Sequence, residues 1–172
     1  MEIVGDIKPV YTIGHSNIPI ENLIFLLEKN DIQILVDVRS VPYSKYFSQA
    51  NKENLDNSLK TKGIKYLYMG ELLGGRPKDI EIQDEYGEID YSILKEQYNF
   101  KKGIERILKG AKDYKLCLLC SEEDPAKCHR GMLISKELFK IGIEIRHIRH
   151  NGQIETQDII EDRIPAVQKH LF

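Results

Sequence analysis

KLCLLCSEEDPAKCHRGMLISKELFK, residues 115–140, is the stretch that decides the fold. Its first six residues are mostly apolar, which is typical of a strand that is covered on both faces of a sheet. Polar residues follow over 121–127, and a helical pattern then runs from residue 128 to about 140, ending before Gly142. A strand, a loop and a helix in this order form part of a βαβ unit, so the stretch predicts a parallel sheet.

The same alternation continues on both sides of this stretch. Further strands are predicted at 10–13, 32–38, 64–69 and 144–148, and helices at 20–28, about 51–62, about 91–112 and near 157–170. We therefore expect an α/β fold in which residues 1–172 form a single domain, with a mostly parallel sheet of about five strands and helices on both faces.

Composition excludes several classes of protein. The 172 residues carry a formal net charge of −2, which excludes a large basic surface that attracts nucleic acid or anionic lipid by charge alone. No apolar run reaches about 20 residues, and the first ten residues lack the layout of a signal peptide. Three cysteines are too few to cross-link a secreted fold by disulfide bonds. We expect a cytoplasmic protein with no membrane partner.

Polar and glycine residues gather where the first four predicted strands end. They are His15 and Ser16, then Asp37 and Arg39, then Glu71, Gly74, Gly75 and Arg76, and finally Cys120, Ser121 and Glu122 followed by Cys128, His129 and Arg130. Any one of these groups is equally typical of a solvated loop or a helix cap. Ligands of open α/β sheets bind beyond the carboxyl ends of the strands, so four groups at one edge favour a binding site.

The residue types indicate an anionic ligand. Arg39, Arg76 and Arg130 offer planar donor forks that suit phosphate or carboxylate, and the start of the helix at Cys128 adds free backbone N–H groups. Ser16, Ser44, Gly74, Gly75 and Cys128 are further candidates for substrate binding. The simpler interpretation is a structural ion pair between Arg39 and Asp37 or Glu122. We expect a small anionic ligand or a nucleotide as partner, and nucleic acid is a second class that the pattern allows.

Chemistry at this edge is expected to involve the thiols and imidazoles. Cys120 is the candidate nucleophile, with Cys128 next, while His15 or His129 transfers protons and Asp37 or Glu122 orients them. The types of Cys120, Cys128, His129 and His15 suit zinc, but their spacing is not that of a zinc knuckle and nearby arginines repel a cation. The sequence therefore predicts no metal and no cofactor, and a metal site at these residues stays open as a third interpretation, which elemental analysis tests.

Four motifs carry a family resemblance. TIGHSN (12–17), LVDVRSVPYS (35–44), YLYMGELLGGRP (66–77) and LLCSEEDPAKCHRGMLI (118–134), followed by RHI (146–148), resemble the domain-of-unknown-function 488 family. The resemblance implies a single α/β domain with these motifs clustered and no established reaction. LVDVRS, residues 35–40, is also similar to a segment of rhodanese-like domains. Related phosphatases have five residues between their cysteine and their arginine, whereas nine residues separate Cys120 from Arg130. This spacing argues against a phosphatase or a sulfurtransferase.

Two hypotheses about function follow. The first is an enzyme with Cys/His-based hydrolytic or transfer chemistry on a phosphate-bearing or otherwise anionic substrate, such as a nucleotide or a nucleic-acid end. The alternative is a non-catalytic module that binds an anionic ligand or nucleic acid through the same residues. The acidic stretch 78–90 is expected to form a surface loop, or a lid over the site.

Overall fold

The computed structural model describes residues 6–77 and 82–164, and its centre is one six-stranded sheet. The strands are β1 (Val10–Gly14), β2 (Ile34–Asp37), β3 (Lys65–Tyr68), β4 (Leu116–Cys120), β5 (Ile145–Ile148) and β6 (Ile154–Thr156), in the spatial order β3-β2-β4-β1-β5-β6. The first five are parallel and β6 pairs with β5 antiparallel. The predicted mostly parallel sheet is confirmed. β6 was not predicted, because three residues are too few to show a periodic pattern.

The helices follow the predicted order with three differences, the first being a short helix at residues 70–73 that the sequence did not predict. They are α1 (Ile20–Lys29), α2 (Lys52–Lys60), α3 (Gly70–Leu73), α4 (Tyr91–Leu94), α5 (Tyr98–Asp113), α6 (Lys136–Lys140) and α7 (Gln157–Glu161). The helix predicted over 91–112 is two helices, α4 and α5. The helix predicted over 128–140 is a π-helical turn, η3 (Arg130–Ser135), that continues into α6. Residues 78–81 of the predicted lid and 165–170 of the predicted tail helix lie outside the described residues.

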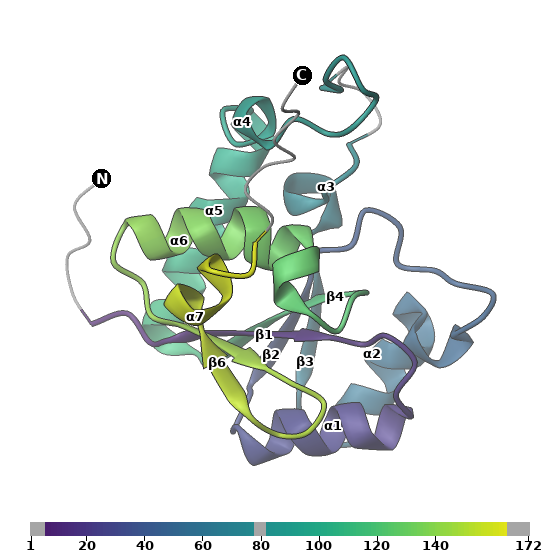
Figure 1. Cartoon of the computed structure of the whole chain (residues 1–172). Coiled ribbons are helices and arrows are strands. Elements are labelled where there is room, and N and C mark those ends of the chain that lie inside the picture. Colours follow the sequence, from purple (N-terminus) through teal and green to yellow (C-terminus); the bar gives the residue numbers. More distant parts are fainter. Residues whose placement is uncertain (1–5, 78–81, 165–172) are drawn as a thin grey trace.

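Helices cover both faces of the sheet, as predicted, and each face has its own core. In Figure 1, α1 and α2 lie below the sheet, while α3, α5 and α6 lie above it. Leu35 and Leu119 belong to the lower core, and Leu118 belongs to the upper one. All three side chains are fully buried, and each such burial contributes about 1.5–3 kcal/mol of stability.

The connections between strands create an opening at the carboxyl edge of the sheet. The chain leaves β1 toward α1 on the lower face, but it leaves β4 toward η3 and α6 on the upper face (Figure 1). β1 and β4 are neighbours, with Gly14 opposite Cys120. A Cβ atom on Gly14 would lie 1.7 Å from the carbonyl oxygen of Glu122, so only glycine allows this approach. Neighbouring strands whose connections diverge form the crevice in which α/β proteins bind ligands. β2, which leads to α2 on the lower face, diverges from its neighbour β4 in the same way.

A buried histidine on β5 is expected to make stability depend on pH. His147 has no exposed surface; its Nδ1 accepts a hydrogen bond from the Thr12 hydroxyl (2.6 Å) and its Nε2 donates to Gln157 (2.7 Å). Burial lowers the pKa of His147 from 6.5 to about 4. Between these values the unfolded chain binds more protons than the folded one, so stability falls as pH falls. We expect His147 to account for a loss of about 2 kcal/mol between pH 7 and pH 4.5.

Urea unfolding of the wild type and of His147→Gln at the two pH values measures this contribution. Carboxyl groups titrate in both proteins, so the difference between their pH dependences isolates His147. The wild type should lose about 2 kcal/mol more than the variant on acidification. Equal losses in the two proteins would show that His147 does not carry the effect.

Candidate functional site

A pocket of about 920 Å³ opens at the carboxyl edge of the sheet, on the face that carries α3 and α5. Several of the residues predicted from the strand ends line it, namely Arg39, Gly75, Arg76, Cys120, Glu122, Cys128 and His129. Pocket walls also come from residues that the sequence did not single out, among them Ser40, Tyr91 and Lys127. The strand-end pattern therefore located this pocket, although it did not supply its whole lining.

The pocket holds a compact cluster of two thiols and one imidazole. Ligand atoms of Cys120, Cys128 and His129 all lie within 4.8 Å of one another, and the Cys120 Sγ is 3.5 Å from His129 Nδ1. Cys120 ends β4, and the other two residues follow the loop 121–127. Both thiols are free and buried. This is the one group of such ligands that the structure shows within residues 6–77 and 82–164.

Backbone carbonyls fix the orientation and the tautomer of His129. Its Nε2 lies 3.1 Å from the carbonyl oxygens of both Val38 and Leu73. Carbonyl oxygens only accept hydrogen bonds, so Nε2 carries a proton, and in the neutral form of the ring the lone pair of Nδ1 faces Cys120. Gly75 lies against the ring, since a Cβ there would be 2.9 Å from His129 Cγ. His129 therefore presents a free nitrogen lone pair to the thiols.

The surroundings shift the pKa values of the two thiols in opposite directions. Burial opposes the Cys128 thiolate, but a hydrogen bond from Cys120 and the positive charge of Arg130 outweigh it and hold the pKa of Cys128 well below its usual value. The same hydrogen bond, together with burial, raises the pKa of Cys120. Burial and the nearby Cys128 charge also raise the pKa of Glu122, whose Oε2 lies 3.9 Å from the Cys120 Sγ. Cys128 is thus the thiol that ionises first.

Arg130 supports this cluster from inside the protein and does not face the pocket. Its side chain has no exposed surface and donates to the carbonyl oxygens of Glu122 (2.6 Å) and Glu123 (3.1 Å) and to the Thr12 hydroxyl (3.2 Å). It makes no ion pair with any residue that the structure describes. The predicted contact with a bound anion is therefore replaced by a structural role, in which Arg130 shapes the loop 121–127.

Arg39 is likewise held by the protein, as the simpler interpretation of the sequence suggested. Its Nε and Nη2 donate to the two carboxylate oxygens of Asp37 at 2.9 and 2.7 Å, and Nη2 also donates to the Ala50 carbonyl oxygen. Asp37 accepts a third side-chain bond from the Tyr66 hydroxyl at 2.5 Å, and burial with this negative charge raises the pKa of Tyr66. Asp37 does not line the pocket, so its geometry is that of a buried ion pair.

His15, Ser16 and Ser44 have hydrogen-bond partners other than the two thiols and His129. His15 Nε2 is 3.3 Å from Arg39 Nη1, and burial lowers the pKa of His15. The Ser16 N–H donates to the Ser121 carbonyl oxygen, and the Ser44 hydroxyl accepts from the backbone N–H groups of the turn that follows it. None of the three lines the pocket. The three side chains are thus not part of the pocket wall, although the His15 backbone N–H donates to the Cys120 carbonyl oxygen at 3.0 Å.

The remaining predicted residues are Gly74 and Arg76. A Cβ on Gly74 would lie 2.4 Å from the Ser40 hydroxyl, so this glycine permits close packing of the protein on itself and does not line the pocket. The Arg76 backbone N–H donates to the same hydroxyl at 2.9 Å. Its guanidinium, like the Lys127 ammonium, makes no ion pair within the described part of the chain. These two cations are available to a ligand in the pocket.

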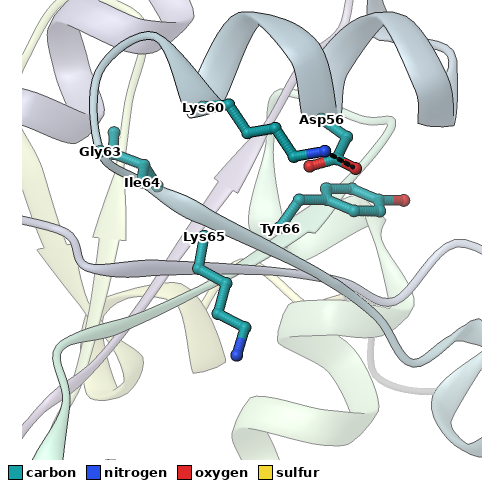
Figure 2. A pocket seen from close by; sticks show the side chains of 6 residues that line it. All are labelled: Asp56, Lys60, Gly63, Ile64, Lys65 and Tyr66. Atoms are coloured by element: carbon teal, nitrogen blue, oxygen red, sulfur yellow. Dashed lines mark ion pairs between the residues drawn. The ribbon is translucent and has the colours of Figure 1, made fainter.

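A second hollow lies between α2 and β3 (Figure 2). Its charged groups pair with each other, since the Lys60 Nζ is 3.3 Å from the Asp56 carboxylate, and Lys65 points away from them in Figure 2. The ring of Tyr66 forms part of the wall, and its hydroxyl belongs to the buried Asp37 network. This hollow has a volume of about 390 Å³ and contains no thiol or imidazole. Its lining offers no reactive group comparable to the cluster.

Substituting Gly75 by alanine is expected to disturb the cluster without unfolding the protein. The added methyl group would press on the His129 ring and break its bonds to the Val38 and Leu73 carbonyls, at a stability cost of about 1–3 kcal/mol. NMR of the imidazole resonances checks this, with Gly110→Ala on α5 as the control, because the nearest atom there is a Leu116 side-chain methyl at 3.3 Å. Unshifted His129 resonances in Gly75→Ala would contradict the packing argument.

Comparisons with known proteins agree with the family resemblance. No curated protein and no solved structure matches the chain significantly, and the likeness of residues 35–40 to rhodanese-like domains finds no support. No helix within 6–77 and 82–164 has the length and apolar character needed to cross a bilayer. A family model described as "Domain of unknown function DUF488" matches residues 19–136, which include the thiol–imidazole cluster and Arg76. This match covers more than half of the sequence, and the chain therefore belongs to the DUF488 family.

Proposed function

We propose that the pocket is the active site of an enzyme that carries out a hydrolytic or group-transfer reaction on a phosphate-bearing or otherwise anionic substrate. The observation that carries this proposal is the approach of Cys120, Cys128 and His129 to within 4.8 Å of one another inside the pocket. Two thiols, an oriented imidazole and a nearby carboxylate supply the nucleophilic and proton-transfer groups that such reactions need.

The cluster would lower the stability of the folded protein if it served only for packing. His129 has Nδ1 directed at a thiol, and both of its Nε2 partners are backbone carbonyls, so the fold holds the ring in one orientation. Arg130 is a buried cation whose charge favours a thiolate at Cys128. An apolar core would need none of these groups, and removing a buried charge in favour of apolar residues often stabilises a protein. Chemistry at the cluster accounts for their presence.

Arg76 and Lys127 supply the recognition of the anion. Both line the pocket, and neither is engaged in an ion pair with a described residue. The bond between the Arg76 N–H and Ser40 positions the start of its side chain. A guanidinium and an ammonium at one pocket favour phosphate or carboxylate groups of the substrate. The reacting bond would then lie toward the cluster, which is in the same pocket.

Two mechanisms use these groups, and the proposed function requires only what they share. In one, a cysteine thiolate attacks the substrate, as the sequence-based assignment of Cys120 expects. In the other, the attacking group is a water molecule bound at the cluster. Both need the thiols and the imidazole, so substitution of Cys128 should abolish either reaction. The alternative function, a non-catalytic module for anionic ligands, shares the cations but does not need the thiols.

A substrate panel tests the proposal. The wild type is incubated with phosphate monoesters, phosphodiesters, nucleotides and short single-stranded oligonucleotides that carry terminal phosphates, and products are detected by mass spectrometry. We expect turnover of one of these classes, at least 100-fold slower in Cys128→Ser. Arg106→Gln, a substitution of an exposed arginine on α5, serves as the matched control and should leave the rate unchanged. Binding without turnover would favour the module. The absence of both binding and turnover for every class in the panel would overturn the proposal.

The same assay gives a separate prediction for Arg76. Arg76→Gln removes the charge and the donor fork but keeps a polar side chain, so we expect KM to rise about 10-fold with a smaller change in kcat. This split between the two constants distinguishes ground-state binding of the anion from chemistry at the cluster. An unchanged KM in Arg76→Gln would place the substrate's anionic group elsewhere.

A further inference from the structure

We infer that Cys120, Cys128 and His129 together bind a zinc ion. The inference rests on the proposed function only in placing this ion in the pocket that receives the substrate. Two thiolates and one imidazole nitrogen are a ligand set that zinc prefers, and soft sulfur ligands disfavour magnesium and calcium.

The spacing of the ligand atoms fits a single tetrahedral ion. With Zn–S near 2.3 Å and Zn–N near 2.1 Å, tetrahedral angles place a sulfur and a nitrogen ligand about 3.6 Å apart and two sulfurs about 3.8 Å apart. Cys120 Sγ and His129 Nδ1 are 3.5 Å apart, and all three ligand atoms lie within 4.8 Å of one another. An ion can therefore enter the cluster with small adjustments of side-chain torsions.

The surroundings of His129 match those of a metal ligand. Histidines that bind metals commonly donate the other ring N–H to a carboxylate or a backbone carbonyl, which fixes the ring and exposes the coordinating nitrogen. Here the Nε2–H faces the carbonyl oxygens of Val38 and Leu73, both at 3.1 Å. Nδ1 is left as the coordinating atom, on the side of the two cysteines. The orientation that zinc needs thus exists before zinc binds.

The two sequence-based objections to a metal are answered by the fold. Cys120 and Cys128 are eight positions apart, but Arg130 holds the carbonyls of Glu122 and Glu123 and so folds the intervening loop back onto β4. Arg39 is neutralised by Asp37. Two thiolates balance the charge of Zn²⁺, so the buried Arg130 would face a neutral centre and not a bare cation. Charge repulsion therefore does not exclude zinc.

Three protein ligands leave the fourth position of the ion open. Closed structural sites have four protein ligands, whereas zinc sites with three keep a position for water or substrate. Glu122 lines the same pocket, and its Oε2 lies 3.9 Å from the Cys120 Sγ. In this arrangement the cysteines act as ligands, and the water-based mechanism is the one the site supports.

Metal content and cobalt spectroscopy test the inference. Untagged full-length protein is expressed with zinc in the medium, purified without chelators and analysed by mass spectrometry for metals. We expect about one zinc per chain in the wild type and in Cys117→Ala, whose thiol lies outside the cluster. Cys128→Ser and His129→Gln should hold less than about one tenth of this amount. After removal of zinc and addition of Co²⁺, the wild type should show thiolate-to-cobalt charge transfer and tetrahedral d–d bands.

The outcomes separate this inference from the proposed function. Wild type without zinc and without the cobalt bands would overturn the inference, as would equal zinc in the variants, and the cobalt spectra of the wild type decide if a variant fails to fold. Zinc at one per chain without turnover of any substrate would leave the inference standing and count against the enzyme. Protein that is purified without zinc and still turns over a substrate would overturn the inference and leave the proposed enzyme standing. It would also favour attack by a cysteine thiolate.

Discussion

Arg130→Lys is expected to lower the free energy of unfolding by about 3–5 kcal/mol, because it leaves buried groups without hydrogen-bond partners. The guanidinium reaches three oxygens in different directions, two carbonyls and the Thr12 hydroxyl. A lysine ammonium is a single point with three donors on a flexible stem, and it cannot match this fork. At least one buried carbonyl would lose its partner, and the buried charge would be poorly solvated.

Urea unfolding and thermal melting measure this effect. For a chain of this length the loss corresponds to a fall in Tm of roughly 10 °C. Arg106→Lys, an exposed substitution of the same type on α5, is the control and should change Tm by less than about 2 °C. If Arg130→Lys melted within the same narrow range as this control, the three hydrogen bonds would not be what holds the loop 121–127 in place.

Asp37→Asn is expected to cost about 3 kcal/mol or more, because it leaves the buried Arg39 charge without a counter-ion. Asp37 has no exposed surface and accepts hydrogen bonds from both Arg39 and Tyr66. Asparagine has nearly the same shape, but its amide nitrogen would point a donor at groups that are themselves donors. The loss therefore comes from charge and hydrogen bonding and not from a cavity.

A double variant separates the ion pair from packing. In Asp37→Asn/Arg39→Met, no unpaired charge remains, so we expect this protein to be more stable than Asp37→Asn alone. Urea unfolding of the two single variants and the double variant completes the cycle. Strictly additive losses would show that the two side chains do not depend on each other, which would contradict the buried pair.

The alternation of strands and helices was readable from the sequence because strands that are buried on both faces appear as apolar runs. The strand order was not readable, since it depends on contacts between residues far apart in the chain. β4 pairs with β2 on one side and with β1 on the other, across separations of about 80 and 105 residues. The break between α4 and α5 was also not predicted. Asp90 caps the short helix α4, and the residues of α4 continue the helical pattern of α5, so the sequence shows one long helix.

The strand-end pattern included several residues that line the pocket, but it did not indicate which way their side chains face. Strand ends place a side chain at an edge of the sheet, but not on one face of it. His15 turns toward Arg39, whereas His129 turns toward Cys120, and only the folded chain distinguishes them. The same limit applies to Arg39 and Arg130, whose partners are set by the fold. Tyr91 carried no signal, because it comes from the long connection between β3 and β4.

A crystal structure with a bound substrate or product from the panel tests the central claim most directly. That claim is that the thiol–imidazole cluster and the cations Arg76 and Lys127 serve one reaction in one pocket. We predict density for the anionic group at Arg76 and Lys127, with the reacting bond within about 3–3.5 Å of the cluster or of an ion bound there. A ligand bound outside this pocket, or one with its reacting bond directed away from Cys120, Cys128 and His129, would contradict the claim.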